Sequence, residues 1–481
     1  MARKKKADAG AEDATRAQEL SNAFTARKPT VDERMAIGKT IRERVPRASL
    51  GTFERPPGVD PVGILLAQAR TRLPKLVPVR HARMLQSPFA FLRGSAAVMA
   101  ADLAASPTTA LRVQACGDMH VANFGVFASA ERQLVFAIND FDETQPGPWE
   151  WDIKRLAASA HVACQHLGGD REAREAAVRF AAASYRQRMR RYAGMGLLEV
   201  WYDTIDSARL LETLSPWFRS AASALLDKAR KRNHLQVLDK MTDLVDDQHR
   251  IIEQHPFIVR VSHTSAGRPV EDALGHFLAT YLDSLAPERR FLLSRYRVLD
   301  VAQKVVGVGS VGTRCWVVLM QGRDEDDPFF LQIKEAEPSV LSPYVPWPGS
   351  GKGPLNEGQR VVVGQRLIQG SPDIFLGWGQ LDRTDFYVRQ LRDMKGGIEL
   401  DMGETTPSAF AEYCRLCGWA LALAHAKSGD AAMIAGYLGK SEAFDDALVR
   451  FAAAYADQTR RDHETFAQAA RSGAVEVAST P

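Results

Sequence analysis

The chain has 481 residues, a hydrophobic fraction of 45%, a charged fraction of 25% and a formal net charge of +4. These values are typical of a globular protein with more than one lobe, and so small a positive excess gives no indication of nucleic-acid binding. No apolar run approaches the ~18 residues of a membrane-spanning helix, so we predict neither a nucleic-acid nor a membrane partner.

Five cysteines are scattered along the chain. An odd and sparse set indicates reduced thiols in a cytoplasmic protein rather than a disulfide framework. Cys414 and Cys417 form a C-x-x-C, but the apolar residues around them have helical spacing, and the sequence holds no second pair for zinc. We therefore interpret both as buried helix residues.

The predicted elements change in character along the chain. A polar start rich in alanine and charge predicts a disordered basic tail. The next part has mostly helical periodicity, entered by two short strand-like runs, LRVQAC (111–116) and LVFAI (134–138). Later β-branched and aromatic runs predict a small sheet, and helices then return, so the fold class is α+β. The predicted tail, helix-rich catalytic lobe, β-rich nucleotide lobe and C-terminal helices span residues 1–30, 31–300, 301–400 and 401–481.

The first strand-like run leads into a polar motif, GDMHVANFG (117–125). The spacing of Asp118, His120 and Asn123 is unsuited to one helical face but suits a loop that folds back on itself. Such a loop can hold a carboxylate toward a substrate hydroxyl and an amide oxygen toward a cation. His120 either takes part in the chemistry or only braces the loop through backbone hydrogen bonds.

The second run leads into an acidic motif, NDFDE (139–143). If the chain stays extended, Asp140 and Asp142 point to opposite sides, and one of them can face the same cation as Asn123. A few hard oxygen ligands that leave open positions are typical of Mg²⁺ held jointly with a phosphate. We predict all three residues as metal ligands, with Asp142 either sharing the metal or capping a turn.

A glycine-rich segment and a lysine are the expected phosphate contacts. The G-x-G-x-x-G segment contributes Gly307, Gly309, Ser310 and Gly312. The β-prone run TRCWVVLM follows at once, which favours strand–turn–strand over the helix that a dinucleotide-binding fingerprint must open. Backbone N–H groups of such a turn can approach phosphates closely. Lys334 lies in the apolar run FFLQIKEA, where a buried ammonium needs an anion such as the phosphates of ATP.

These motifs carry a resemblance. GDMHVANF followed by INDFDE resembles the G-D-x-H-x-x-N and I-D-[FW] signatures of aminoglycoside and choline kinases, and GVGSVG with the lysine of LQIK resembles a kinase glycine-rich loop and strand lysine. Kinases place the glycine loop and lysine first, whereas here they come last. The resemblance therefore implies a protein-kinase-like, two-lobed fold in circularly permuted order. The combination of FLRG, GDxHxxNFG, NDFDE and VGVGSVGTR over residues 40–465 is also similar to a bacterial family of unknown function, DUF2252.

Carried over residue by residue, the resemblance implies Asp118 as the base that accepts the proton of the substrate hydroxyl. It implies Asn123 and Asp140 as ligands of Mg²⁺, and Lys334 as the group that contacts the α- and β-phosphates of ATP. The kinase family's acid partner for this lysine lies on a following helix, and Glu357 is the candidate for it.

Two further residues belong to the same motifs. Asp152, in GPWEWDIKRLA, matches an acid of the kinase pattern, and we interpret it as an anchor between the first motif and a helix. Arg93, in FLRG, is either a phosphate contact or an ion-pair residue, and the sequence does not choose between these roles.

Four functions compete. The first is an ATP- and Mg²⁺-dependent phosphotransferase, or its variant that transfers AMP. Its acceptor is predicted to be a small-molecule hydroxyl, because residues 143–150 leave no room for the long activation segment on which protein kinases hold peptides.

The second is a non-catalytic nucleotide-binding module, or pseudokinase, of the same fold. The third, a metallophosphoesterase, needs further histidine and asparagine ligands, typically in a GNH motif, and the sequence has no such motif. The fourth, a nicotinamide oxidoreductase, needs the helix that the glycine-rich segment does not open.

Overall fold

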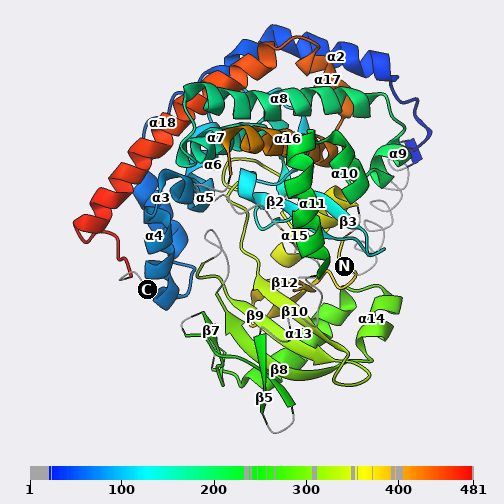
Figure 1. Cartoon of the computed structure of the whole chain (residues 1–481), viewed down its shortest axis with the longest axis vertical. Coiled ribbons are helices and arrows are strands. Elements are labelled where there is room, and N and C mark those ends of the chain that lie inside the picture. Colours follow the sequence, from blue (N-terminus) through cyan, green and yellow to red (C-terminus); the bar gives the residue numbers. More distant parts are fainter. Residues whose placement is uncertain are drawn as a thin grey trace, which may run out of the picture.

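The protein divides into a helical body and a body built on one sheet (Figure 1). The two together make an α+β fold, as predicted. Among the residues described, no helix combines the length and the apolar character needed to cross a bilayer. The computed structural model describes residues 21–22, 24–231, 238, 241–245, 248–255, 257–264, 267–305, 311–347, 353–354, 356–370, 372–391, 396 and 405–478.

The helical body is built from both ends of the chain. One continuous apolar core joins residues between Val45 and Ala229 with residues between Phe410 and Ala456. Its longer helices are α2 (Val31–Arg44), α7 (Trp149–His166), α8 (Arg171–Ala193), α16 (Pro407–Ser428), α17 (Ala431–Leu438) and α18 (Ala443–Arg471). Shorter helices are α3 (Pro61–Ala69), α4 (Val77–Leu85), α5 (Pro88–Gly94), α6 (Ala96–Leu103), α9 (Leu197–Tyr202), α10 (Ser207–Thr213), α11 (Pro216–Lys231) and α15 (Glu357–Gln369). Single 3₁₀ turns are η1 (Arg47–Gly51), η2 (Pro74–Leu76) and η3 (Val121–Asn123).

Helix α16 lies inside this body and is buried on almost every side, which is the pattern of a helix enclosed by protein. Gly418 permits the close contact with α8, because a Cβ atom there would lie 2.1 Å from the carbonyl oxygen of Ala181. Cys414 and Cys417 are both buried free thiols in α16, so their prediction as buried helix residues is confirmed. Burial raises the pKa of both thiols well above the usual range.

A six-stranded antiparallel sheet forms the second body, in the order β11-β12-β10-β9-β8-β7. Its strands are β7 (Ile258–Val259), β8 (Arg297–Lys304), β9 (Cys315–Gln321), β10 (Pro328–Glu335), β11 (Gly377–Leu381) and β12 (Thr384–Gln390). Successive residues of β10 point to opposite faces of the sheet. Phe329, Leu331 and Ile333 pack in one core with helices α13 (Val270–Asp283) and α14 (Pro287–Leu293), whereas Phe330 belongs to a separate core. Lys334 therefore lies on the face opposite these two helices.

The sheet body begins earlier than the sequence predicted. Strand β7 and helices α13 and α14 precede residue 301, yet they pair with or pack on the sheet, as does the hairpin of β5 (Thr242–Val245) and β6 (Gln248–Ile251). The boundary predicted at residue 300 is therefore too late, because helical periodicity does not reveal which partner a helix covers. Conversely, α15 lies within 301–400 but contributes Val361 and Val362 to the core of the helical body.

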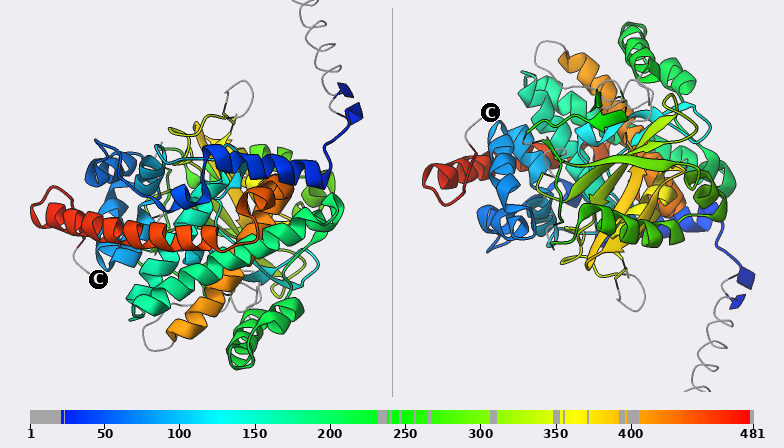
Figure 2. Two further views of the ribbon diagram at one scale, coloured as in Figure 1. Left: turned by 90° about the horizontal axis from the view of Figure 1, so that it is seen from above. Right: turned by 90° about the horizontal axis from the view of Figure 1, so that it is seen from below.

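Two small antiparallel ladders carry the polar motifs to the junction of the two bodies (Figure 1). In the first, β1 (Arg112–Ala115) pairs with β4 (Gln145–Pro148), and in the second, β2 (Phe124–Ala128) pairs with β3 (Leu134–Ile138). Seen from below, the six-stranded sheet lies across the underside of the helical body (Figure 2). The loops that follow β1 and β3 therefore lie between helices and sheet.

Candidate functional site

The loop after β1 is held by the first turns of helix α7. The carboxylate of Asp152 accepts hydrogen bonds from the backbone N–H groups of Cys116, at 2.6 Å, and Gly117, at 3.0 Å. His425 Nε2 lies 3.2 Å from the same carboxylate. Gly117 has φ +76°, and a Cβ atom there would lie 2.5 Å from the carbonyl oxygen of Glu143. The interpretation of Asp152 as an anchor of the loop is confirmed.

Asp118 lies at the start of this loop with its side chain 21% exposed. One carboxylate oxygen, Oδ1, accepts from Arg155 Nε at 2.7 Å. The other, Oδ2, lies 3.8 Å from His120 Nε2. Burial raises the pKa of Asp118, while the charges of Arg155 and Arg93 act in the opposite direction. The carboxylate thus has one oxygen engaged and one oxygen directed to the neighbouring histidine and cavity.

His120 is 4% exposed and braces the loop. Its Nδ1 accepts from the backbone N–H of Ala122 at 3.2 Å, which caps the 3₁₀ turn η3. Burial, together with the charges of Arg93 and Arg155, lowers the pKa of His120 well below its usual range. The imidazole is therefore neutral at physiological pH. This geometry supports the bracing role over the catalytic role that the sequence also allowed.

Asn123 connects the two motif loops. Its side-chain Nδ2 donates to the carbonyl oxygen of Asp118 at 2.6 Å, and its own carbonyl oxygen accepts from the backbone N–H of Asn139 at 3.0 Å. Because the amide nitrogen is used inside the loop, the amide oxygen is the atom left for a cation, as the metal-ligand prediction requires.

Asp140 and Asp142 both line one cavity, so the expectation that they point to opposite sides is wrong. The extended backbone ends with β3 at Ile138, and the chain then turns, with Phe141 buried in the core. Asp140 has no ion-pair partner among the described residues. Burial raises the pKa of its carboxyl, the charge of Asp142 raises it further, and Lys334 opposes both effects.

Lys334 forms an ion pair with Asp142 across the junction of the two bodies. The hydroxyl of Tyr387 donates to the same carboxylate at 2.7 Å. Burial alone would lower the pKa of Lys334, but Asp142, Tyr387 and Asp140 together raise it above the usual range. Burial would likewise raise the pKa of Asp142, but Lys334 and the hydrogen bonds lower it. Both members of the pair are therefore ionised.

Glu357 is not the acid partner of Lys334, which corrects the prediction. Its carboxylate pairs instead with Arg360, one turn along helix α15, with Nε and Oε2 2.5 Å apart. Arg360 also donates to the carbonyl oxygen of Thr144 at 2.7 Å. The ion pair with Arg360 on the same helix therefore engages Glu357, the acid that the resemblance assigned to Lys334. Asp142 from the second motif is the acid partner of Lys334 instead.

The glycine-rich segment is described only from Val311 onward. Three of the predicted phosphate contacts lie outside the described residues: Gly307, Gly309 and Ser310. The carbonyl oxygen of Gly312 accepts from the backbone N–H of Leu73 at 2.7 Å, and Arg72 donates to the carbonyl oxygen of Val311 at 2.6 Å. Strand β9 follows, antiparallel to β8, so the segment lies between two strands and does not open a helix. This arrangement removes the basis of the nicotinamide interpretation.

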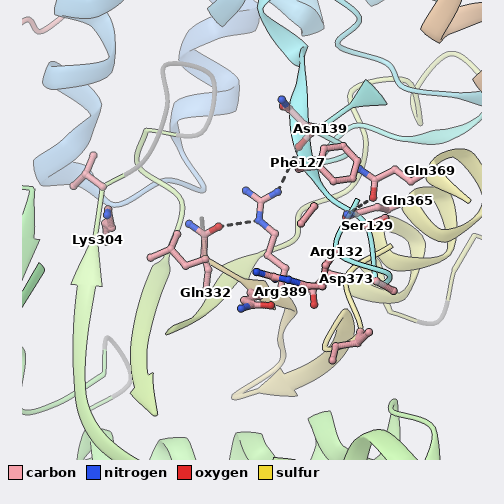
Figure 3. A pocket seen from close by; sticks show the side chains of 16 residues that line it. Phe127, Ser129, Arg132, Asn139, Lys304, Gln332, Gln365, Gln369, Asp373 and Arg389 are labelled. Carbon is pink, nitrogen blue, oxygen red and sulfur yellow. Dashed lines mark hydrogen bonds between the residues drawn. The ribbon is translucent and has the colours of Figure 1, made fainter. Parts of the chain in front are cut away.

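Two cavities flank the Lys334–Asp142 pair. The smaller, of about 100 Å³, is called the motif cavity and is lined by Gln68, Arg72, Arg80, Arg93, Gly94, Ala96, Cys116, Asp118, His120, Asn123, Asp140, Asp142, Glu143, Thr313, Glu335, Ala336 and Glu337. The larger, of about 500 Å³, is called the sheet cavity and is lined by Phe127, Ala128, Ser129, Ala130, Arg132, Asn139, Lys304, Val305, Gln332, Gln365, Gln369, Asp373, Ile374, Arg389, Gln390 and Leu391 (Figure 3). Neighbouring residues of one segment, Asn139 and Asp140, line different cavities, so the two spaces adjoin.

The sheet cavity is rich in amide groups (Figure 3). Arg389 donates from Nε to Gln332 Oε1 at 2.9 Å and contacts the carbonyl oxygen of Asn139 at 3.4 Å. Gln365 donates to Gln369 at 2.9 Å, but its own side-chain oxygen is buried without a hydrogen-bond partner. A buried acceptor of this kind is costly unless a ligand donor satisfies it.

The donors around Asp140 fit a magnesium ion better than a metal enclosed by protein alone. The oxygen atoms of Asn123, Asp140 and Asp142 are hard ligands, and the unpaired carboxylate of Asp140 calls for a cation. Within the described part of the chain, no group of three or more histidine, cysteine, aspartate or glutamate side chains could hold a metal ion. Magnesium commonly takes only one or two protein carboxylates and completes its shell with phosphate and water.

Sequence reasoning missed several groups of the site. Arg155 lies three residues after Asp152 on helix α7, so both face the loop, and the helical period could have identified it. Tyr387 and Arg389 lie two residues apart on β12, so they share a face of the sheet, and the strand period could have identified them together. Arg72 and Arg80 lie in segments without a recognisable motif, and their sequence positions carry no signal of the cavity.

The comparisons with known proteins give one match. A family model described as "Uncharacterized protein conserved in bacteria (DUF2252)" matches residues 72–469. Neither the curated proteins nor the solved structures contain a match. The chain therefore belongs to the DUF2252 family.

Proposed function

We propose that this member of the DUF2252 family is an ATP- and magnesium-dependent phosphotransferase that acts on a small-molecule hydroxyl. One observation carries the proposal. Asp118, Asn123 and Asp140, from two motifs, line a single cavity, and Lys334 from a distant strand forms an ion pair with Asp142 at its wall. A base, metal ligands and a phosphate-binding cation are the parts that phosphoryl transfer requires.

The larger cavity supplies a place for the nucleotide base. The unpartnered side-chain oxygen of Gln365 would accept from an exocyclic amino group such as that of adenine. Gln332 and Lys334 lie two residues apart on β10 and therefore on the same face of the sheet. A nucleotide with its base in the sheet cavity would extend its phosphates toward Lys334. The γ-phosphate would then reach the motif cavity.

Asn123, Asp140 and Asp142 would hold magnesium, which when bound neutralises charge on the phosphates. Before nucleotide binds, Lys334 and Asp142 satisfy each other. On nucleotide binding, Lys334 would exchange part of this contact for phosphate oxygens, and Asp142 would then be able to contact the metal. This exchange couples nucleotide binding to completion of the metal site.

Asp118 would position the acceptor hydroxyl through Oδ2, since Arg155 occupies Oδ1. The acceptor oxygen forms a bond to the γ-phosphorus, and the bond between that phosphorus and the β,γ-bridging oxygen breaks. The hydroxyl proton passes to Asp118, and ADP leaves. In this reaction class, positioning and electrostatic stabilisation supply most of the acceleration.

One observation favours a second candidate, the non-catalytic nucleotide-binding module. The ion pair with Arg155 stabilises the charged form of Asp118 and so opposes the basicity that burial confers on this carboxylate. Turnover separates the two candidates, because both predict nucleotide binding.

The test uses the full chain with ATP labelled at the γ- or the α-phosphate, magnesium and a metabolite extract. The proposal expects only γ-label to move, onto a small molecule, and expects Asp118→Asn to prevent the transfer. Movement of α-label with release of pyrophosphate would indicate AMP transfer instead. Label found only on protein would refute the small-molecule acceptor, and binding of ATP without transfer would support the non-catalytic candidate. Absence of ATP binding would refute both.

A further inference from the structure

Three arginines line the motif cavity and come from a part of the chain that the proposed chemistry does not use. Arg72 follows helix α3, Arg80 lies on α4, and Arg93 lies on α5. These helices lie beside the junction of the two bodies (Figure 1). The cavity lining therefore combines basic residues from short helices with acidic residues from the motif loops.

The guanidinium groups are buried and incompletely satisfied. Arg80 is 1% exposed and donates from Nη2 to the carbonyl oxygen of Gly94 at 2.7 Å and to Gln68 Oε1 at 3.0 Å. Its Nε and Nη1 are buried without a partner. Arg72 is 6% exposed and donates to a backbone carbonyl, and its Nε has no partner. The buried Nε of Arg93 has none either.

No carboxylate neutralises these three groups at close range. Within the described part of the chain, none of Arg72, Arg80 and Arg93 has an acidic oxygen within the 4.0 Å of an ion pair. Several acids of the cavity are engaged elsewhere. The established ion pairs are Asp118 with Arg155, Asp142 with Lys334 and Glu335 with Arg314. The charges of Glu143 and Glu337 act on Arg72 and Arg80 only from beyond this distance. Clustering buried cations without a direct ion-pair partner is costly, and a ligand anion would reduce that cost.

We propose that Arg72, Arg80 and Arg93 bind a compact oxyanion, a phosphate or carboxylate group, that belongs to the acceptor. Guanidinium groups match both anions because their planar forks donate two parallel hydrogen bonds. The acceptor is thus a small hydroxy compound that already carries an anionic group, such as a phosphorylated polyol or a hydroxy acid. That the anion belongs to the acceptor rests on the proposed function, whereas the anion site itself does not.

The alternative is that the arginines are structural clamps. Arg80 ties α4 to α5 through Gly94, and Arg72 ties the end of α3 to Val311 beside the glycine-rich segment. A clamp needs only the donors that already have carbonyl partners. It gives no role to the unpartnered donors and predicts no affinity for anions.

The experiment titrates inorganic phosphate into the full chain by calorimetry, first alone and then in the presence of saturating magnesium and a non-hydrolysable ATP analogue. The variants are Arg80→Met and Arg93→Met, with Arg70→Met as the control, because Arg70 is exposed and lies two residues from Arg72 outside the cavity. We expect wild type and the control to bind phosphate in both conditions. We expect both cavity variants to weaken phosphate binding at least tenfold while their affinity for the analogue changes less than twofold.

Each other outcome decides against a defined part of the proposal. No phosphate binding by wild type, or equal binding by the cavity variants, would overturn the anion site. Two results would show that the arginines bind the nucleotide: competition between phosphate and the analogue, or a loss of affinity for the analogue as well as for phosphate in the variants. Either result would overturn the proposed acceptor class. Failure of wild type to bind the analogue would refute the proposed function, and the titration of phosphate alone would still decide the anion site. Arg93 is less buried than Arg80, so its variant keeps the test valid if Arg80→Met does not fold.

Discussion

The carboxyl group of Glu143 allows a quantitative test of the electrostatics of the motif cavity. Its Oε2 accepts from the backbone N–H of Val340 at 2.7 Å. Burial raises the pKa of Glu143 from 4.5 to about 7, although the Val340 hydrogen bond acts in the opposite direction. Because the pKa is higher in the folded state, the native protein holds this proton more tightly than the unfolded chain. The free energy of unfolding is therefore undiminished below pH 4.5 and falls as the pH rises through about 7.

The size of the effect follows from the shift. One pKa unit corresponds to about 1.4 kcal/mol, so keeping Glu143 ionised in the folded state costs about 3 kcal/mol, of which roughly 2.5 kcal/mol develops between pH 5 and pH 8. Glutamine is neutral at every pH and nearly isosteric. The free energy of unfolding of Glu143→Gln minus that of wild type should therefore increase by about 2 to 3 kcal/mol from pH 5 to pH 8.

The assay is urea unfolding at pH 5 and pH 8, followed by tryptophan fluorescence. Glu54→Gln, the same change at an exposed position outside the cavity, is the control. A difference between Glu143→Gln and wild type that stays constant within about 0.5 kcal/mol would refute the raised pKa, and with it the burial of this carboxyl.

The further predictions concern three charged groups of the site. Asp140→Asn should abolish magnesium-dependent activity and leave the thermal midpoint unchanged or higher, because burial and Asp142 already disfavour the charge; a large fall in the midpoint would show a structural role instead. Lys334→Met should lower the free energy of unfolding by about 3 kcal/mol, because Asp142, whose side chain is 25% exposed, loses its ion-pair partner. Adding Asp142→Asn should recover most of this loss. Denaturant titration of both variants checks this, and additive losses would contradict it. Lys334→Met should also weaken ATP binding in calorimetry. Asp118→Asn should reduce turnover by about a hundredfold or more with little change in ATP affinity, and full turnover with lost affinity would make Asp118 a binding residue.

Several features were decided locally, and the sequence alone predicted them. Strand β9 follows the glycine-rich segment because TRCWVVLM has strong strand propensity, whatever the rest of the chain does. The short strands before each motif and the helix that buries Cys414 and Cys417 follow from local periodicity in the same way. The polar residue types of the two motifs likewise identified the loops that meet at one cavity.

Other features depend on how distant segments pack, and only the tertiary structure decided them. Lys334 pairs with Asp142 and not with Glu357, because the sheet lies against the turn after β3 while Arg360 neutralises Glu357 within its own helix. The direction of the Asp140 and Asp142 carboxylates depends on where the extended backbone of β3 ends. The period of two in a strand does not reveal this end point. Of the arginines of the motif cavity, Arg93 belongs to the FLRG motif, whereas Arg72 and Arg80 belong to none. Their position results from short helices whose apolar sides pack into the helical body, and this packing, rather than any local preference, brings buried cations to the site.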